Sequence, residues 1–364
     1  MAEITRQQIE LALKQVQDPY VGKDLVSAKE IKDIQVTGTA VKIVAQLGYP
    51  AKGFVDEFAA AVRQQVKADV PEVSSVEVAV DWQITSHAVQ KNLKPMANIK
   101  NIVAVASGKG GVGKSTVAVN LALALSADGA RVGILDADIY GPSQPRMMGI
   151  DAKPVSQDGK SLEPMENYGV QAMSIGFLID ADTPMIWRGP MVTQALEQLL
   201  GDTQWRDLDY LIVDMPPGTG DVQLTLAQRI PVSGAVIVTT PQDIALLDAR
   251  KGLKMFEKVE VKVLGIVENM STHICSKCGH EEHIFGSGGG ERMAKDYNVE
   301  LLGALPLDIQ IREQADGGKP TVVADPEGRI TRMYLDIARK MAARLGSAAK
   351  DYSARFPKIV IQNT

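Results

Sequence analysis

The stretch Gly-Lys-Gly-Gly-Val-Gly-Lys-Ser-Thr, residues 108–116, decides the fold of this chain. It follows an apolar run at 102–106 that is typical of a buried strand, and it precedes a run of good helix formers at 115–127. This glycine, lysine and serine spacing between a strand and a helix is that of a phosphate-binding P-loop. The glycines let backbone N–H groups converge on phosphate oxygens, and the helix start adds its positive dipole end. The sequence therefore predicts a P-loop NTPase that binds a nucleoside triphosphate.

The P-loop also predicts which side chains contact the nucleotide. Lys114 is expected to reach the β- and γ-phosphates, and the Ser115 hydroxyl is expected to bind Mg²⁺. The loop residues predicted to bind the nucleotide are Gly108, Gly110, Gly111, Val112, Gly113, Lys114, Ser115 and Thr116.

Composition restricts the class of protein. The chain has 364 residues, of which 45% are hydrophobic and 23% charged, as in an ordinary globular protein large enough for two domains. A net charge of −5 argues against a general nucleic-acid binder, and no stretch approaches the ~18 apolar residues of a membrane span. Two cysteines provide no disulfide framework. We expect a cytoplasmic protein that binds neither nucleic acid nor membrane.

Hydrophobic patterning divides the chain into four parts. Residues 1–85 predict a small α/β domain, 86–98 a polar linker, 99–346 the P-loop domain, and 347–364 a C-terminal tail. Alternating strand-like and helical segments in the third part predict a doubly wound, mainly parallel sheet, with the ligand at the carboxyl ends of the strands. Residues 151–168 read as a hairpin or loop insertion. The expected strands cover 101–106, 131–135, 170–175, 210–214, 234–240, 262–268 and 301–305.

Polar residues follow three of these strands. Asp136 and Asp138 straddle one strand end, so one can join the metal shell while the other faces the γ-phosphate. Asp214 ends the apolar run Leu-Ile-Val, as in a Walker B strand, and is expected to hold Mg²⁺ through water. Asn269 ends a third strand, where the nucleotide base should lie.

Both cysteines lie in His-Ile-Cys-Ser-Lys-Cys-Gly-His-Glu-Glu-His, residues 273–283. Cys275 and Cys278 can chelate one metal ion or one edge of a cluster, but they cannot complete a four-thiolate site in one subunit. In one interpretation His280 and His283 complete a zinc site within the chain. In another, two subunits each supply a pair to a [4Fe–4S] cluster. A chance pair of buried thiols and a redox dithiol are further alternatives.

Residues Lys109 to Ser115 resemble the deviant P-loop of the family that contains MinD, ParA and nitrogenase iron protein. The resemblance implies that two subunits face each other and that Lys109 acts on the partner's phosphates, as an arginine finger does. A solvated turn lysine is the alternative. The resemblance also assigns Asp138 to the attacking water, Asp136 to the Mg²⁺ shell and Asn269 to the adenine edge. A helix cap for Asp138 and a turn for Asn269 are the alternatives.

The combination of motifs is similar to the Mrp/ApbC family of ATP-binding iron–sulfur cluster carriers. It includes Asp-Met-Pro-Pro-Gly at 214–218, the cysteine pair, and a small domain that resembles SufT-type assembly factors at 18–20 and 47–53. The small domain has Ala51 and Lys52 where some relatives carry a cysteine, so packing or partner docking is its expected role. Arg188 and Asp308 are predicted dimer-face residues.

This resemblance implies a homodimeric ATP hydrolase that binds a bridging [4Fe–4S] cluster and transfers it to apo-proteins, with cluster scaffold proteins as further partners. Its catalytic residues would be Lys109, Lys114 and Asp138, with Mg²⁺ as the metal of ATP. The alternatives are a MinD/ParA-like positioning ATPase, an electron-donating reductase, and an ATPase with a structural zinc site.

Overall fold

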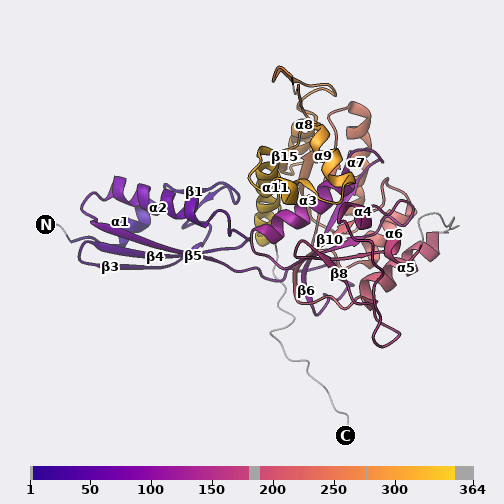
Figure 1. Ribbon diagram of the computed structural model, residues 1–364. Coiled ribbons are helices and arrows are strands. Elements are labelled where there is room, and N and C mark those ends of the chain that lie inside the picture. The colour runs from indigo at the N-terminus through magenta and orange to yellow at the C-terminus, as the bar shows by residue number, and fades with distance from the viewer. Residues whose placement is uncertain (1–2, 180–188, 276, 349–364) are drawn as a thin grey trace, which may run out of the picture.

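The structure is a computed structural model and describes residues 3–179, 189–275 and 277–348. Figure 1 shows a small N-terminal body on the left and a larger body on the right. Most of the C-terminal tail predicted at 347–364 lies outside the described residues. Among the described residues, no helix has both the length and the apolar character needed to cross a membrane.

The small body is a three-stranded sheet with helices on one face (Figure 1). Its first helix starts with a capping box, in which Thr5 and Gln8 each bind the other's backbone N–H. Strand β4 (Ala40–Leu47) buries every second side chain, as a sheet covered on one side requires. The order is β3-β4-β5, with β3 antiparallel and β5 parallel to β4. The other elements are α1 (Arg6–Leu13), β1 (Gln17–Asp18), β2 (Lys23–Asp24), β3 (Ile31–Thr37), α2 (Val55–Asp69) and β5 (Ser75–Trp82).

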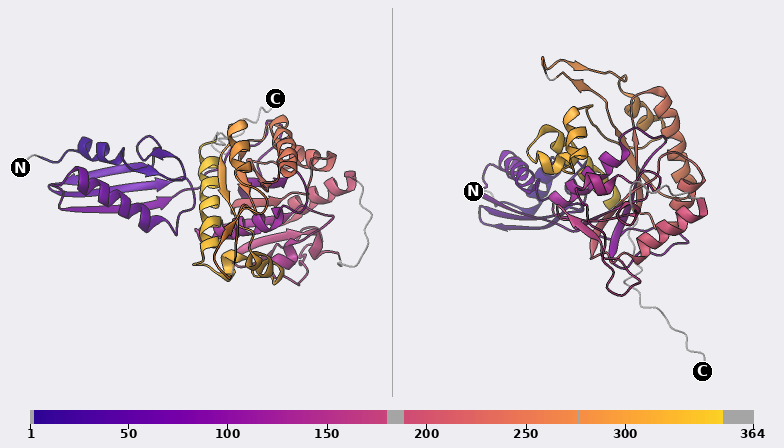
Figure 2. Two further views of the ribbon diagram at one scale, coloured as in Figure 1. Left: turned by 90° about the horizontal axis from the view of Figure 1, so that it is seen from above. Right: turned by 45° about the vertical axis from the view of Figure 1, so that its right-hand side comes forward.

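The large body confirms the predicted doubly wound sheet. Its eight strands run in the order β15-β12-β11-β6-β10-β7-β9-β8, and only β8 is antiparallel to its neighbour. The inner strands are mainly apolar and almost wholly buried because helices cover both faces of the sheet (Figure 2). The strands are β6 (Ile99–Ser107), β7 (Val132–Asp136), β8 (Met165–Asn167), β9 (Val170–Ser174), β10 (Leu208–Asp214), β11 (Gly234–Thr239), β12 (Val263–Glu268) and β15 (Leu301–Ala304).

The P-loop helix α3 (Lys114–Ala127) lies in the core of this body. It is apolar on all sides because α11 covers the face that the sheet leaves open. The remaining helices are α4 (Gln144–Met147), the 3-10 turn η1 (Ile175–Phe177), α5 (Gly189–Asp202), α6 (Asp221–Arg229), α7 (Asp243–Lys258), α8 (Gly289–Asp296), α9 (Ile309–Asp316), α10 (Thr321–Ala324) and α11 (Arg329–Gly346).

Two short features complete the topology. The insertion predicted at 151–168 is a loop that ends in the edge strand β8. A small hairpin of β13 (His273–Ile274) and β14 (Glu281–Glu282) carries the cysteine segment and projects from the body at the top of Figure 1.

A buried ion pair of the large body anchors the small body at the junction. Arg339 on α11 donates to the Asp128 carboxylate over 2.6 and 2.9 Å, and the two side chains are only 9% and 3% exposed. The guanidinium also bonds the Tyr20 hydroxyl over 3.0 Å and lies against the Tyr20 and Phe54 rings. Asp128 in turn accepts the Gly53 N–H. Figure 2 shows α11, in yellow, on the side that faces the small body.

The segment predicted as a linker at 86–98 has little regular structure, yet it is held at several points. The His87 ring bonds the Asn101 amide over 2.9 Å, and both groups are buried. The Gln90 side chain donates to the Ala227 carbonyl and accepts the Val232 N–H. The connection between the two bodies is therefore packed against the large sheet.

Candidate functional site

The predicted nucleotide-binding residues meet at the carboxyl edge of the large sheet. β6 leads into the P-loop, and its neighbour β10 ends at Asp214. Asp136, at the end of β7, stands directly opposite Asp214 in the parallel register. Asn269 follows β12 on the other side of β6. The strand order thus brings together the P-loop, both strand-end acids and Asn269.

Two glycines show how closely the P-loop is surrounded. A Cβ atom at Gly108 would lie 2.1 Å from the Asp248 carbonyl carbon on α7. A Cβ atom at Gly113 would lie 2.2 Å from the Asn269 Nδ2 atom, and Gly113 also has a φ of +81°. Only glycine fits both the space and the left-handed backbone at this second position.

Lys114 is the buried cation of the site. Its ammonium donates to the Asp214 carboxylate and, over 3.1 Å, to the Ser115 hydroxyl. It also lies 3.9 Å from the Asp138 carboxylate. Lys114 and Asp214 are 6% and 0% exposed, so their charges are screened little by solvent.

Asp136 is fully buried and holds the loop that follows β7. Its Oδ2 atom accepts the backbone N–H groups of Ser143 and Gln144 and the Ser174 hydroxyl, while its Oδ1 atom accepts the Asp138 N–H. Burial, together with the nearby Asp214 charge, raises the pKa of Asp136 to about 7. With four donors already on its carboxylate, the role predicted for Asp136 in the Mg²⁺ shell would pass through water.

Asp138 is only partly exposed and faces Lys114. Burial raises the pKa of Asp138, while the Lys114 charge partly offsets this effect. A carboxylate with a raised pKa is better suited to accept a proton near neutral pH than an ordinary aspartate. Its predicted role toward the attacking water stays a prediction.

Gln144 is a site residue that the sequence analysis missed. Its side-chain N–H group donates to Asp214 over 2.9 Å and to the Ser115 carbonyl over 3.2 Å. Gln144 begins the short helix α4, and no motif marks it; its only signal is its position after the Asp-Ile-Tyr-Gly-Pro loop.

The residues present fit a magnesium nucleotide. The loop supplies convergent backbone N–H groups, and Asp214 and Ser115 are hard oxygen donors of the kind that Mg²⁺ prefers. Two buried oxygens beside them, Ser143 Oγ and Gln144 Oε1, have no hydrogen-bond partner among the described residues. Buried polar atoms of this kind call for a further partner, and a hydrated metal ion provides one.

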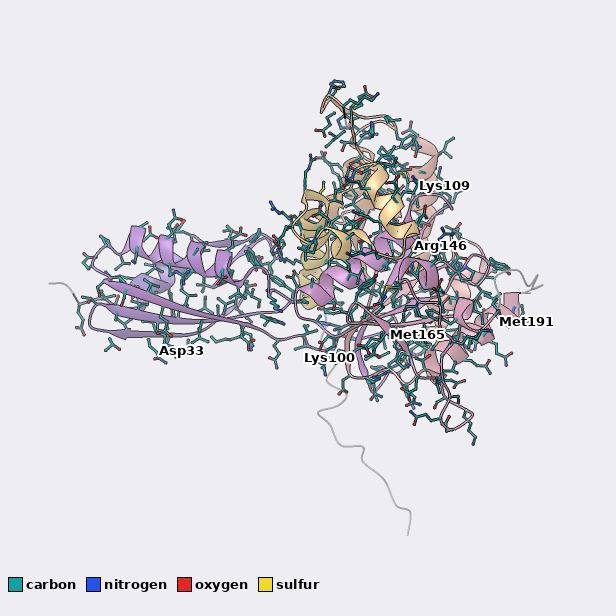
Figure 3. All side chains as sticks on the ribbon, in the orientation of Figure 1. Asp33, Lys100, Lys109, Arg146, Met165 and Met191 are labelled. Atoms are coloured by element: carbon teal, nitrogen blue, oxygen red, sulfur yellow. The ribbon has the colours of Figure 1, made fainter. Side chains whose placement is uncertain are left out.

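Lys109 differs from Lys114 in its surroundings. Its carbonyl accepts the Ser107 hydroxyl over 2.9 Å. Within the described part of the chain, its ammonium makes no ion pair or hydrogen bond. Figure 3 labels Lys109 in the upper part of the large body. This cation is therefore available to a group outside its own subunit.

Asn269 contacts the P-loop from the side. Its Nδ2 atom donates to the Val112 carbonyl over 2.9 Å, and its backbone N–H donates to Thr239 over 2.7 Å. The side chain is 7% exposed. Its predicted contact with adenine stays a prediction, and the interpretation as a simple turn residue misses this bond to the loop.

The two cysteines lie in one turn with their thiols free. Cys278 is exposed and Cys275 partly exposed, and both are free thiols. The N–H groups of Lys277 and Cys278 donate to the Cys275 sulfur and lower the pKa of this thiol. The Gly279 N–H closes the turn on the Cys275 carbonyl over 2.8 Å. Such N–H···S bonds stabilise a metal-bound thiolate.

The structure does not assemble the predicted single-chain zinc site. Within residues 3–179, 189–275 and 277–348, no group of three or more His, Cys, Asp or Glu side chains could hold a metal ion. His283 instead bonds the Ser271 carbonyl over 3.0 Å, and His280 lies near Glu282. Neither thiol is buried, so the alternative prediction of a pair of buried thiols is wrong.

The structure describes one of the two predicted dimer-face residues. Arg188 lies outside the described residues. Asp308 begins α9 as its N-cap and accepts the Gln310 N–H over 2.8 Å.

Comparison with known proteins gives consistent results for both bodies. Residues 98–342 match the model of the ParA family, described as NUBPL iron-transfer P-loop NTPase, and residues 6–80 match an iron–sulfur cluster assembly protein domain. The iron–sulfur cluster carrier protein of Haemophilus influenzae is 52% identical over 93% of this chain and 91% of its own length. The mouse iron–sulfur cluster transfer protein NUBPL is 51% identical over 73% and 84%.

Among solved structures, a nucleotide-binding protein from Archaeoglobus fulgidus in complex with ADP is 39% identical. It covers 64% of this chain and 90% of its own, with a TM-score of 0.56. The cell-division ATPase MinD from Pyrococcus furiosus shares the fold alone, at 22% identity and a TM-score of 0.52, over 66% of this chain and 97% of its own. By its sequence and both of its matched regions, the chain belongs to the NUBPL iron-transfer P-loop NTPase family.

Proposed function

We propose that this protein is an iron–sulfur cluster carrier that binds and hydrolyses ATP. Two subunits hold one [4Fe–4S] cluster between their Cys275 and Cys278 pairs and transfer it to apo-proteins. The family membership and the names of the relatives support the carrier role. The observation that carries the proposal is the exposed two-cysteine turn, whose sulfur atoms lack further ligands in the described residues.

The number of ligands favours a shared cluster. A [4Fe–4S] cluster takes four thiolates, and this chain contains two cysteines. A second copy of the same turn, related by a twofold axis, supplies the missing pair without any new residue. The cluster is the cargo here, so partly exposed ligands favour its release.

Exposed apolar side chains support a dimer through the nucleotide edge. Tyr140 follows β7, Ile244 and Leu247 follow β11, and Ile309 follows β15, so all four come after carboxyl strand ends. They are 61%, 70%, 54% and 61% exposed. Large apolar residues that gather on one edge are typical of an interface. The Lys109 ammonium, which has no partner among the described residues, lies on the same edge and would reach the nucleotide of the facing subunit.

The residues of the P-loop edge fit ATP hydrolysis. Lys114 and the loop N–H groups would hold the phosphates, and Asp214 and Ser115 would hold Mg²⁺, which neutralises developing charge. Asp138 would orient the attacking water, and Lys109 of the facing subunit would stabilise the transition state. Lys114 must exchange its bond with Asp214 for the phosphates, so nucleotide binding changes the ion pairs beneath the loop.

Anaerobic reconstitution with iron and sulfide tests the proposal. A shared cluster gives about two irons per subunit and the broad visible absorption of a [4Fe–4S] centre. The Cys278→Ala variant should lose the cluster and keep nucleotide binding, while Ser287→Ala, in the same exposed segment, should keep both. Full iron content in Cys278→Ala would contradict the proposal. We further propose a cytoplasmic location, with scaffold proteins as cluster donors.

A further inference from the structure

One short segment, Glu268–Ser271, lies in space between the P-loop and the cysteine hairpin. It is here named the β12 pivot. It begins at the last residue of β12, and the hairpin starts at His273. The other end of the hairpin segment returns to the same place, because the N–H of Gly290 at the start of α8 donates to the Glu268 carboxylate. Both ends of the hairpin segment are therefore fixed at the pivot.

The pivot is in direct contact with the P-loop. The Asn269 amide donates to the Val112 carbonyl over 2.9 Å and occupies the space where Gly113 lacks a side chain. The terminal Met270 methyl lies 3.8 Å from the same Cβ position. A shift of the loop at these two residues must displace Asn269 or break its bond.

Met270 holds the turn between the strand and the hairpin in a strained conformation. Its φ is +58°, in the left-handed region that is unfavourable for a residue with a side chain. Such strain persists only where neighbouring contacts impose it. Asn269 on one side is bonded to Thr239 and Val112, and Ser271 on the other side is bonded twice to the Leu305 carbonyl.

Beyond Met270, hydrogen bonds join the start of the hairpin to its return strand and to Leu307. The Ser271 carbonyl lies 3.0 Å from Nδ1 of His283, on the return strand of the hairpin. The Leu307 N–H donates to Thr272 over 2.7 Å, and the Cys275 N–H donates to His280 over 2.9 Å. A rotation at the pivot would therefore move both strands of the hairpin together.

We propose that Asn269 and Met270 are positioning residues that couple the P-loop to the cysteine hairpin. Nucleotide at the loop changes the orientation and exposure of Cys275 and Cys278 through the β12 pivot. The use of this coupling in cluster transfer rests on the proposed function. The coupling itself concerns the thiols of one subunit and can be measured without a cluster.

The test measures maleimide modification of the two thiols in metal-free, full-length protein with and without Mg·ADP. Light scattering must give the same mass in both conditions, so that dimer formation does not protect the thiols. In the wild type, nucleotide should change the modification rate by about fivefold or more, as for ordinary allosteric coupling. Met270→Gly, which removes the strain and the contact with the loop, should bind Mg·ADP with an unchanged Kd and lose the response.

Two further variants make the outcome decisive. Glu260→Gly removes the same left-handed strain, at a φ of +58°, before the opposite end of β12, and should respond like the wild type. Asn269→Ala should stay unresponsive even at saturating Mg·ADP; recovery at saturation would mean that Asn269 contacts only the nucleotide. A wild-type response in Met270→Gly, or none in the wild type, would overturn the coupling while leaving the iron content of the carrier untouched.

Discussion

Replacement of Arg339 by methionine should weaken the junction between the two bodies more than any surface substitution. The variant keeps an apolar stem against the Tyr20 and Phe54 rings but leaves the Asp128 carboxylate with the Gly53 N–H as its one remaining donor among the described residues. Removal of one partner from a buried ion pair costs about 3–5 kcal/mol. The loss of two cation–π contacts, at 5.5 and 5.6 Å, adds about 1 kcal/mol at most.

Urea unfolding followed by circular dichroism and tryptophan fluorescence measures this effect. Trp82 packs against Gly129 at the junction, so its fluorescence should report separation of the small body before the large sheet unfolds. Arg344→Met is the matched control on the same helix, because its partner Glu300 is 41% exposed; it should cost less than about 1 kcal/mol.

A double-mutant cycle with Asp128→Asn completes the design. The double variant should be more stable than Arg339→Met alone, because it leaves no unpaired buried carboxylate. If Arg339→Met costs no more than the Arg344→Met control, the Arg339 cluster does not stabilise the junction and the reasoning is refuted.

Three further outcomes are expected. Gly113→Ala should abolish nucleotide binding in equilibrium titration, since its Cβ would lie 2.2 Å from Asn269 Nδ2; binding within about tenfold of wild type (~1.4 kcal/mol) would contradict the packing at the loop. Lys109→Ala should bind nucleotide normally but lose about a thousandfold in kcat, as for loss of an arginine finger, whereas unchanged turnover would exclude a role in trans. Burial and the neighbouring Asp18 raise the pKa of Glu30 to about 9, so the folded protein keeps a proton that the unfolded chain loses above about pH 4.5. Stability should therefore fall as pH rises from 5 to 8, by up to ~1.4 kcal/mol per pH unit, and Glu30→Gln should flatten that slope; equal slopes in chemical denaturation would refute it.

Local patterns predicted most of the fold. The P-loop spacing and the continuous apolar runs identified the strands of the parallel sheet, because a strand buried on both faces must be apolar throughout. The patterns at 151–168 predicted a hairpin or a loop insertion without placing strand β8, since a strand of three residues has too short a pattern.

Long-range contacts could not be predicted from such patterns. The sequence alone identified Lys114 and Asp214 because each belongs to a recognisable motif. It missed Gln144, which reaches Asp214 from a short helix without a motif. It also missed the pair of Asp128 and Arg339, which are 211 positions apart and meet only when α3 and α11 of the large body pack together. Contacts of this kind depend on the relative placement of elements rather than on any one segment.

Native mass spectrometry of the anaerobically reconstituted protein tests the shared cluster most directly. We predict a species with the mass of two chains and one Fe₄S₄ unit, and no iron–sulfur-loaded single chain. A monomer that carries a complete cluster, or a zinc ion in place of iron after anaerobic purification, would contradict the central claim.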